Sequence, residues 1–327
     1  MDGSSRLKLG ALGLVWSLSL GCNTKHDFDT MPEQAVIAQE SKWNAKVDFL
    51  ILVDNSPSMA KYQNRFSAEI PALVASLKSA GIDAHFAIIT TTMNDKTGGR
   101  FVGTPRFITS ETKDLATLLQ SRIKLGENGS NVERGFEAIL ASLSSEYLAT
   151  EGAGFLRSEA LLSLILLTNE NDYSDMEPLK VAQYLDLLKP PIQAQRTTYR
   201  NWVANHLGVL DLEGSCKSTP EFNEPSDEYV ALAEYSGGIK ASICDTSFGG
   251  AVANIQKRLI EVMTDFPLDR LPLVETIKVF VDSKLIPNDP VNGWTYETEG
   301  NLIRFHGEAL PNPEAKVTID FKPAGGV

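Results

Sequence analysis

Apolar and polar positions divide most of the chain into short buried strands that alternate with amphipathic helices. Residues 47–53 read Val-Asp-Phe-Leu-Ile-Leu-Val, a nearly continuous apolar run that is typical of a strand buried on both faces. Residues 62–80 then place apolar side chains at helical spacing, and Gly81 ends the predicted helix. The same alternation continues to about residue 266.

The remaining elements of this region follow the same pattern. We expect strands at residues 84–91, 101–108, 161–168, 202–207 and 239–243, and helices at 112–124, 132–148, 177–188, 227–235 and 248–264. This alternation predicts an α/β domain over residues 46–267, with a doubly wound, mostly parallel sheet and helices on both faces. Ligands of such sheets bind beyond the carboxyl ends of the strands, so chemistry is expected in the loops after Val53, Thr91 and Thr168.

The pattern changes after Pro267. Short runs of alternating or clustered apolar residues are separated by turn signals such as Asn-Asp-Pro at 288–290 and Pro-Asn-Pro at 311–313, and no helical periodicity remains. Residues 268–327 are therefore predicted to form a small antiparallel β module. A module of this size buries little apolar surface alone, so we expect it to pack on the larger domain.

The first 45 residues differ from both regions. Arg6 and Lys8 precede an uncharged run, residues 9–21, which is too short to span a membrane and is typical of an export signal over residues 1–21. Residues 18–22, Leu-Ser-Leu-Gly-Cys, resemble the bacterial lipobox, which implies lipidation of Cys22; a plain cleaved signal is the alternative. The polar stretch that follows, to residue 45, is predicted to be a tether.

Charge and cysteine content narrow the possible partners and the compartment. The chain has 30 Lys and Arg against 42 Asp and Glu, a net charge of −12, which argues against nucleic-acid binding. With Cys22 assigned to lipid, Cys216 and Cys244 remain, and in an oxidising compartment they are expected to form a disulfide. Two buried free thiols are the alternative.

A candidate cation site follows the first buried strand. Asp54-Asn55-Ser56-Pro57-Ser58 places one carboxylate and two hydroxyls at alternate positions of a loop that leads into a helix. These are hard oxygen ligands with a single formal charge, a set that suits Mg²⁺ or Mn²⁺ better than Zn²⁺. The alternative is a helix N-cap in which the same oxygens accept backbone N–H groups.

Residues 47–59 resemble the opening of von Willebrand factor A (vWA) domains, whose metal-ion-dependent adhesion site (MIDAS) begins with D-x-S-x-S. In that family a second loop supplies a threonine and a third loop an aspartate, and Ser130 and Asn169 stand at the corresponding places here. Asn169 removes one negative charge, for which Glu170 or Asp172 could compensate as auxiliary metal ligands. The implied ligand set is Asp54, Ser56, Ser58, Ser130 and Asn169.

The resemblance implies a function in binding. The whole arrangement is similar to exported bacterial lipoproteins with one vWA domain, lipid-anchored in the cell envelope and facing the periplasm or the cell surface. Their cation, here Mg²⁺ or Mn²⁺, binds an Asp or Glu carboxylate of a partner protein, in adhesion or another protein–protein interaction. A metal-free structural or assembly factor is the alternative. The sequence has no HExxH, G-x-S-x-G, P-loop or G-x-G-x-x-G motif, and we expect no enzymatic activity.

Overall fold

The structure is a computed structural model that describes residues 36–42, 44–94, 97–193, 198–213, 216–217, 222, 224–312 and 315–325. The predicted export signal, Cys22 and the tether up to residue 35 lie outside the described residues. Residues from Val36 onward belong to one compact unit. In the described ranges, no helix has both the length and the apolar character needed to cross a membrane.

The main sheet has the strand order β4-β3-β2-β5-β8-β9. Its strands are β2 (Lys46–Val53), β3 (Asp83–Thr90), β4 (Ile108–Thr109), β5 (Leu161–Leu167), β8 (Trp202–Gly208) and β9 (Lys240–Ser242). All neighbours pair in parallel except β4, which is antiparallel to β3. By rank along the chain the order is 3-2-1-4-5-6, in which the strand order reverses between β2 and β5. The predicted mixed α/β class with a mostly parallel sheet is confirmed.

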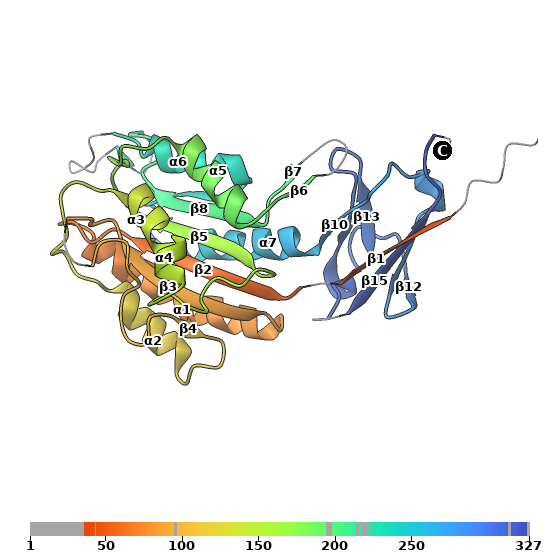
Figure 1. The fold of residues 1–327 in the computed structure, drawn as a ribbon, viewed down its shortest axis with the longest axis horizontal. Helices are drawn as coiled ribbons and strands as arrows, with labels where there is room; N and C mark the ends of the chain where they lie inside the picture. The colour runs from red at the N-terminus through yellow and green to blue at the C-terminus, as the bar shows by residue number, and fades with distance from the viewer. Residues whose placement is uncertain are drawn as a thin grey trace, which may run out of the picture. The chain divides into compact units, whose positions relative to one another are not determined.

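Hydrophobic cores cover both faces of this sheet. Phe49 and Ile51 of β2 belong to one core, and Leu50 and Leu52, which point the other way, belong to a second. The first core includes side chains of α1 (Ala60–Ser79), α2 (Leu115–Ile123) and α7 (Gly249–Thr264). The second includes side chains of α3 (Gly135–Ser142), α4 (Ser145–Leu148), α5 (Pro178–Leu188) and α6 (Asp227–Ser236). Figure 1 labels these helices beside the strands of the main sheet. Burial on both faces explains why β2 and β5 are almost entirely apolar.

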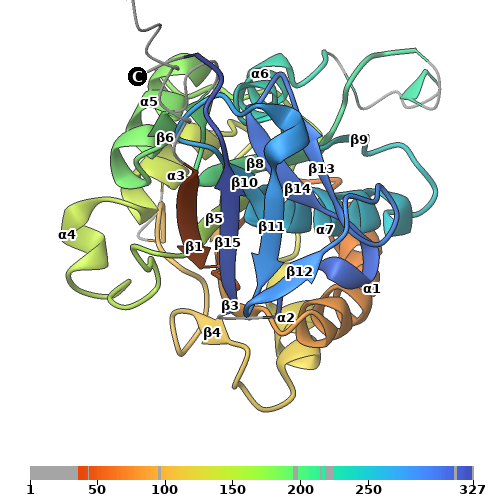
Figure 2. The ribbon, with the colours of Figure 1, turned by 90° about the vertical axis from the view of Figure 1, so that its right-hand side faces the viewer.

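Small antiparallel sheets form the second part of the compact unit. One contains β1 (Ile37–Lys42), β15 (Lys316–Phe321), β11 (Lys278–Val281) and β12 (Lys284–Ile286), which Figure 2 shows side by side in this order. Another contains β10 (Asp265–Pro267), β14 (Leu302–Phe305) and β13 (Trp294–Glu297). A shorter pair joins β6 (Ile192–Gln193) to β7 (Thr198–Tyr199). Antiparallel strands after residue 267 agree with the sequence pattern.

Strand β1 was not expected, because we predicted residues 22–45 to be a tether. The structure pairs β1 with β15 from Ile37 opposite Phe321 to Lys42 opposite Lys316. Gln39 also bonds to strand β10 and to the segment that follows it, since its Nε2 donates to Pro267 O (2.7 Å) and its Oε1 accepts from Asp269 N (3.0 Å). An edge strand with one apolar contact residue, Ile37, leaves almost no hydrophobic pattern in the sequence.

The predicted disulfide is confirmed. Cys216 and Cys244 are bonded, with their Cα atoms 5.3 Å apart. The bond joins the segment that follows β8 to the segment between β9 and α7. Free thiols, the alternative, are therefore excluded for this pair.

His206 on β8 is completely buried beneath α6. Its Nδ1 lies 3.2 Å from the carbonyl oxygen of Leu166, which can only accept, so the proton is on Nδ1. Its Nε2 lies 2.7 Å from Ser226 Oγ, and its ring stacks on Tyr229 with centroids 5.4 Å apart. Burial lowers the pKa of His206 to about 4.

The buried His206 should make the fold sensitive to mild acid. Between pH 6.5, its ordinary pKa, and about 4, the unfolded chain binds a proton that the folded chain does not. The free energy of unfolding should therefore fall by up to about 3 kcal/mol across this window. Urea unfolding at several pH values should show a flatter pH profile for His206→Gln than for the wild type. His306→Gln, at a partly exposed histidine, is the matched control.

Candidate functional site

Loops that follow β2, β3 and β5 meet at one edge of the main sheet. The parallel register sets Val53 beside Thr90 on one side and beside Leu167 on the other, so these strands end at the same level. Asp54, the first residue after β2, donates its backbone N–H to Leu167 O (2.9 Å). This edge lies next to the point where the strand order reverses, where ligands of doubly wound sheets bind.

The Asp54 carboxylate is at the centre of this edge and is completely buried. Its Oδ1 accepts from Ser56 N (2.7 Å) and its Oδ2 accepts from Thr168 Oγ1 (2.8 Å). Burial raises the pKa of Asp54, and the hydrogen bonds from Ser56, Thr168 and the Asn169 backbone oppose that rise. The charged form is thus supported by neutral donors alone.

The structure brings Ser56, Ser58 and Asn169 together around Asp54. Asn169 is almost fully buried, and its Nδ2 donates to Ser58 Oγ at 3.3 Å. Ser58 has a left-handed backbone with φ of 86°, an unfavourable conformation for a residue with a side chain. Ser56 Oγ and Asn169 Oδ1 are both buried and have no hydrogen-bond partner of normal geometry among the described residues.

Ser130 lies in the second loop but is connected to Asp54 only indirectly. Gly129 N donates to Asn55 O (2.7 Å), and Thr92 Oγ1 donates to Asn55 Oδ1 (3.0 Å) while accepting from Ser130 N (2.9 Å). The Ser130 hydroxyl oxygen itself accepts from Val132 N (3.0 Å). These bonds hold the loop beside Asn55. The Ser130 hydroxyl, which was predicted to bind the metal, instead accepts a hydrogen bond within its own turn.

Glu133 was missed by the sequence analysis, which placed it within a helix over residues 132–148. The helix α3 instead begins at Gly135, because the preceding backbone is bonded to the neighbouring loops. Arg134 N donates to Thr91 O (3.0 Å), and Glu133 O accepts from Tyr173 N (2.8 Å). The Glu133 side chain is completely buried.

The Glu133 carboxylate lies in an acidic environment. Both of its oxygens, like the hydroxyl of Thr91, lack a hydrogen-bond partner of normal geometry within the part of the chain that the structure describes. Burial, with the negative charges of Asp54, Glu170 and Asp172, raises the pKa of Glu133 to about 8. The nearby Thr91 hydroxyl opposes this rise.

Asp172, a predicted auxiliary ligand, is instead bonded within the protein. Its Oδ2 accepts from Phe136 N (3.1 Å) at the start of α3 and from Tyr229 Oη (2.8 Å) on α6. Its Oδ1 accepts from Ser174 N (3.0 Å). Gly135 is required beside this contact, since a Cβ there would lie 2.2 Å from Tyr229 Oη. The geometry of Asp172 therefore favours an anchor for α3 and α6 over a metal ligand.

Glu170, the other predicted auxiliary residue, is partly exposed at the rim of this edge. Its pKa is raised by partial burial first and then by the negative charges of Asp54 and Glu224. Beside it, Tyr173 Oη donates to Glu224 Oε1 at 2.6 Å, which raises the pKa of Tyr173 to about 12. The rim of the site is therefore strongly acidic.

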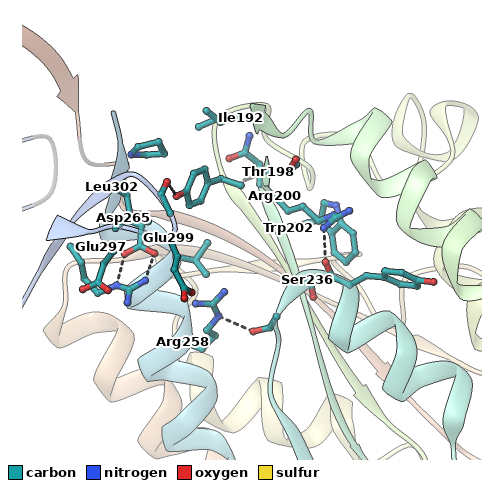
Figure 3. A pocket seen from close by; sticks show the side chains of 18 residues that line it. Ile192, Thr198, Arg200, Trp202, Ser236, Arg258, Asp265, Glu297, Glu299 and Leu302 are labelled. Atoms are coloured by element: carbon teal, nitrogen blue, oxygen red, sulfur yellow. Dashed lines mark hydrogen bonds and ion pairs between the residues drawn. The ribbon is translucent and has the colours of Figure 1, made fainter. Parts of the chain in front are cut away.

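A cavity of about 460 Å³ lies elsewhere, at the amino end of β8 (Figure 3). Three of its charged residues, Arg304, Asp265 and Arg258, are already bonded within the protein, which makes it a weaker candidate than the edge at Asp54. Arg304 binds both carboxylate oxygens of Asp265 (2.7 and 2.8 Å), and Arg258 Nε donates to Gly237 O (2.9 Å).

Comparison with known proteins gives distant structural similarities. No family model and no curated protein matches the chain. Proximal thread matrix protein 1 from the mussel byssus, in a structure with a zinc-occupied MIDAS motif, has a TM-score of 0.44 at 11% identity over 71% of this chain and 52% of that chain. The pilus adhesin RrgA from Streptococcus pneumoniae has a TM-score of 0.36 at 9% identity over 88% of this chain and 58% of that chain.

The pilus adhesin SpaC from Lactobacillus rhamnosus GG has a TM-score of 0.39 at 10% identity. The match covers 89% of this chain and 41% of SpaC. This chain therefore spans only about half the length of the structures it resembles.

The bond between Tyr229 and Asp172 should contribute to stability. Tyr229→Phe removes a donor from a buried carboxylate, and we expect the free energy of unfolding to fall by about 1–3 kcal/mol. Chemical denaturation followed by circular dichroism measures this change. Tyr235→Phe, on the exposed side of the same helix, should have little effect. Equal losses in the two variants would contradict the anchoring role of Asp172.

Proposed function

We propose that the chain binds Mg²⁺ or Mn²⁺ at the edge formed by Asp54 and, through this cation, binds a protein partner. One observation carries the proposal: Ser56 Oγ and Asn169 Oδ1 are buried beside the Asp54 carboxylate and have no hydrogen-bond partner of normal geometry among the described residues. Buried polar atoms in folded proteins are nearly always paired, or satisfied by water or an ion. Acceptor oxygens gathered around one carboxylate form the environment that a hard cation satisfies.

The donor types fit this ion. Asp54 supplies a carboxylate, Ser56 and Ser58 supply hydroxyls, and Asn169 supplies an amide oxygen. Mg²⁺ and Mn²⁺ favour such oxygen ligands, whereas structural zinc sites are dominated by cysteine and histidine. Among the described residues no group of three His, Cys, Asp or Glu side chains is arranged to hold a metal, so the site depends on neutral oxygens as well.

A cation held largely by neutral oxygens keeps part of its positive charge. We propose that an Asp or Glu carboxylate from a partner protein completes its coordination, in adhesion or another protein–protein interaction, and that the chain is not an enzyme. The D-x-S-x-S sequence at the carboxyl end of the first sheet strand and the strand order 3-2-1-4-5-6 support assignment to the vWA class. The lipobox-like sequence supports a lipid-anchored protein of the bacterial cell envelope, facing the periplasm or the cell surface.

A metal-free structural or assembly factor of the envelope is the second candidate. Asn169 replaces the aspartate of the family pattern, and the Ser130 hydroxyl oxygen already accepts from Val132 N. The first feature removes a charged ligand from the expected site, and the second leaves the Ser130 oxygen less available to a metal. Calorimetry that detects no Mg²⁺ or Mn²⁺ binding by the wild type would favour this candidate.

Replacing Ser56 tests the cation site with little risk to the fold. Because Ser56 Oγ makes no normal hydrogen bond to a described residue, Ser56→Ala should melt in chelator at the wild-type temperature or slightly above it. The wild type should gain about 2.7 kcal/mol at a free cation concentration near one hundred times Kd, and the variant should gain much less. Thermal melts with and without Mn²⁺ measure both effects.

Ser145→Ala, an exposed serine at the start of α4, is the matched control and should keep the full cation response. An equal response in Ser56→Ala would contradict the cation site.

Partner binding should depend on the same oxygens. Immobilised wild-type protein should capture its partner from envelope extracts in Mg²⁺ and release it in EDTA, because the cation bridges the two proteins. Ser56→Ala should capture little of the same protein in either buffer, whereas Ser145→Ala should behave as the wild type. Capture that persists undiminished in EDTA would favour the metal-free candidate.

A further inference from the structure

The second loop offers the site a carboxylate in addition to the predicted hydroxyl. Ser130 Oγ accepts from Val132 N (3.0 Å), so its hydrogen-bonding capacity is partly used within its own turn. Three residues further on, Glu133 is completely buried. Neither of its carboxylate oxygens has a hydrogen-bond partner of normal geometry in the described ranges.

The backbone holds Glu133 firmly in this position. Its carbonyl oxygen accepts from Tyr173 N (2.8 Å) in the loop after β5, and Arg134 N donates to Thr91 O (3.0 Å) in the loop after β3. The Gly135 that follows packs against Tyr229 and Leu52 too closely to accept a Cβ. The backbone of this segment therefore cannot turn outward without breaking contacts to the loops after β3 and β5, to Tyr229 and to Leu52.

The environment of Glu133 makes this burial costly unless a positive charge is present. A buried carboxylate is strongly destabilising when it has neither an ionic partner nor hydrogen bonds. The charged groups that act on Glu133 are Asp54, Glu170 and Asp172, all of them acidic. Asp172 is bonded to Phe136 N and Tyr229 Oη, whereas the donor beside Glu133 is the Thr91 hydroxyl, which makes no hydrogen bond of normal geometry to it.

We infer that Glu133 is a direct ligand of the cation and replaces Ser130 as the donor of the second loop. This inference rests on the proposed cation site at Asp54. With Glu133 the site contains two carboxylates from different loops, and Mg²⁺ is commonly held by one or two carboxylates with water in other positions. The cation then joins the loop after β2 to the segment before α3, and its positive charge balances both buried carboxylates.

The test measures the Mn²⁺ affinities of the Glu133→Gln and Ser130→Ala variants of the full chain by titration calorimetry. Glu133→Gln should bind Mn²⁺ at least about tenfold more weakly than the wild type, because a charged ligand is lost. Ser130→Ala should keep the wild-type affinity. The matched control is Glu146→Gln, at an exposed glutamate in α4, which should also bind as the wild type.

Melting in EDTA provides a second readout, which separates a ligand from a structural glutamate. Glu133→Gln should melt at the wild-type temperature or above it, since a buried carboxyl group with no hydrogen bond of normal geometry to the described residues is replaced by an uncharged group of the same shape. A glutamate that only supported the fold would lower the melting temperature when replaced. Glu133→Asp keeps the carboxylate but shortens the side chain, and it should also weaken Mn²⁺ binding. This second variant tests the inference even if Glu133→Gln does not fold.

The outcomes distinguish this inference from the proposed function. Wild-type protein that binds no Mn²⁺ would overturn the cation site and the role of Glu133 together. Wild-type affinity in Glu133→Gln, or a loss confined to Ser130→Ala, would overturn the role of Glu133 alone. Weak binding by both Glu133 variants with normal binding by Ser130→Ala would support it.

Discussion

The parallel pairing of β2 with β3 on one side and β5 on the other is the constraint on which the site depends. It brings the ends of these strands to one level, and Asp54 is therefore buried between loops that are far apart in the sequence. Each loop then bonds to the next: Thr168 to Asp54, Thr92 to Asn55, and Tyr173 to Glu133. Shifting one strand by a residue would separate these oxygens, so the site and the sheet register are inseparable.

Burial gives the carboxylates of this edge different roles. Asp172 receives three hydrogen bonds and connects α3 to α6, as a buried acid with sufficient donors can. Asp54 is partly satisfied, and Glu133 has no normal hydrogen bond to the described residues. Burial raises the pKa of both Asp54 and Glu133, and a raised pKa of a buried carboxyl is what an added cation reverses.

Much of the fold follows from the sequence because burial on both faces leaves long apolar runs, as in β2 and β5. The disulfide was likewise predictable, from the cysteine count and the predicted export signal. Strand β1 was not, because an edge strand needs backbone partners more than apolar side chains. The burial of Glu133 could not be predicted, because a glutamate among apolar residues at helical spacing resembles a residue on the exposed face of a helix. Its burial depends on Thr91 and Tyr173, which are distant in sequence.

The order β1 then β2 also determines how the protein would carry mechanical load. Only residues 43–45 separate the two strands, so the shortest covalent path from any attachment before Val36 to Asp54 runs along β1 and β2. A pull from that side would reach Asp54 through the backbone of these two strands, which their ladders hold to β15 and to β3 and β5.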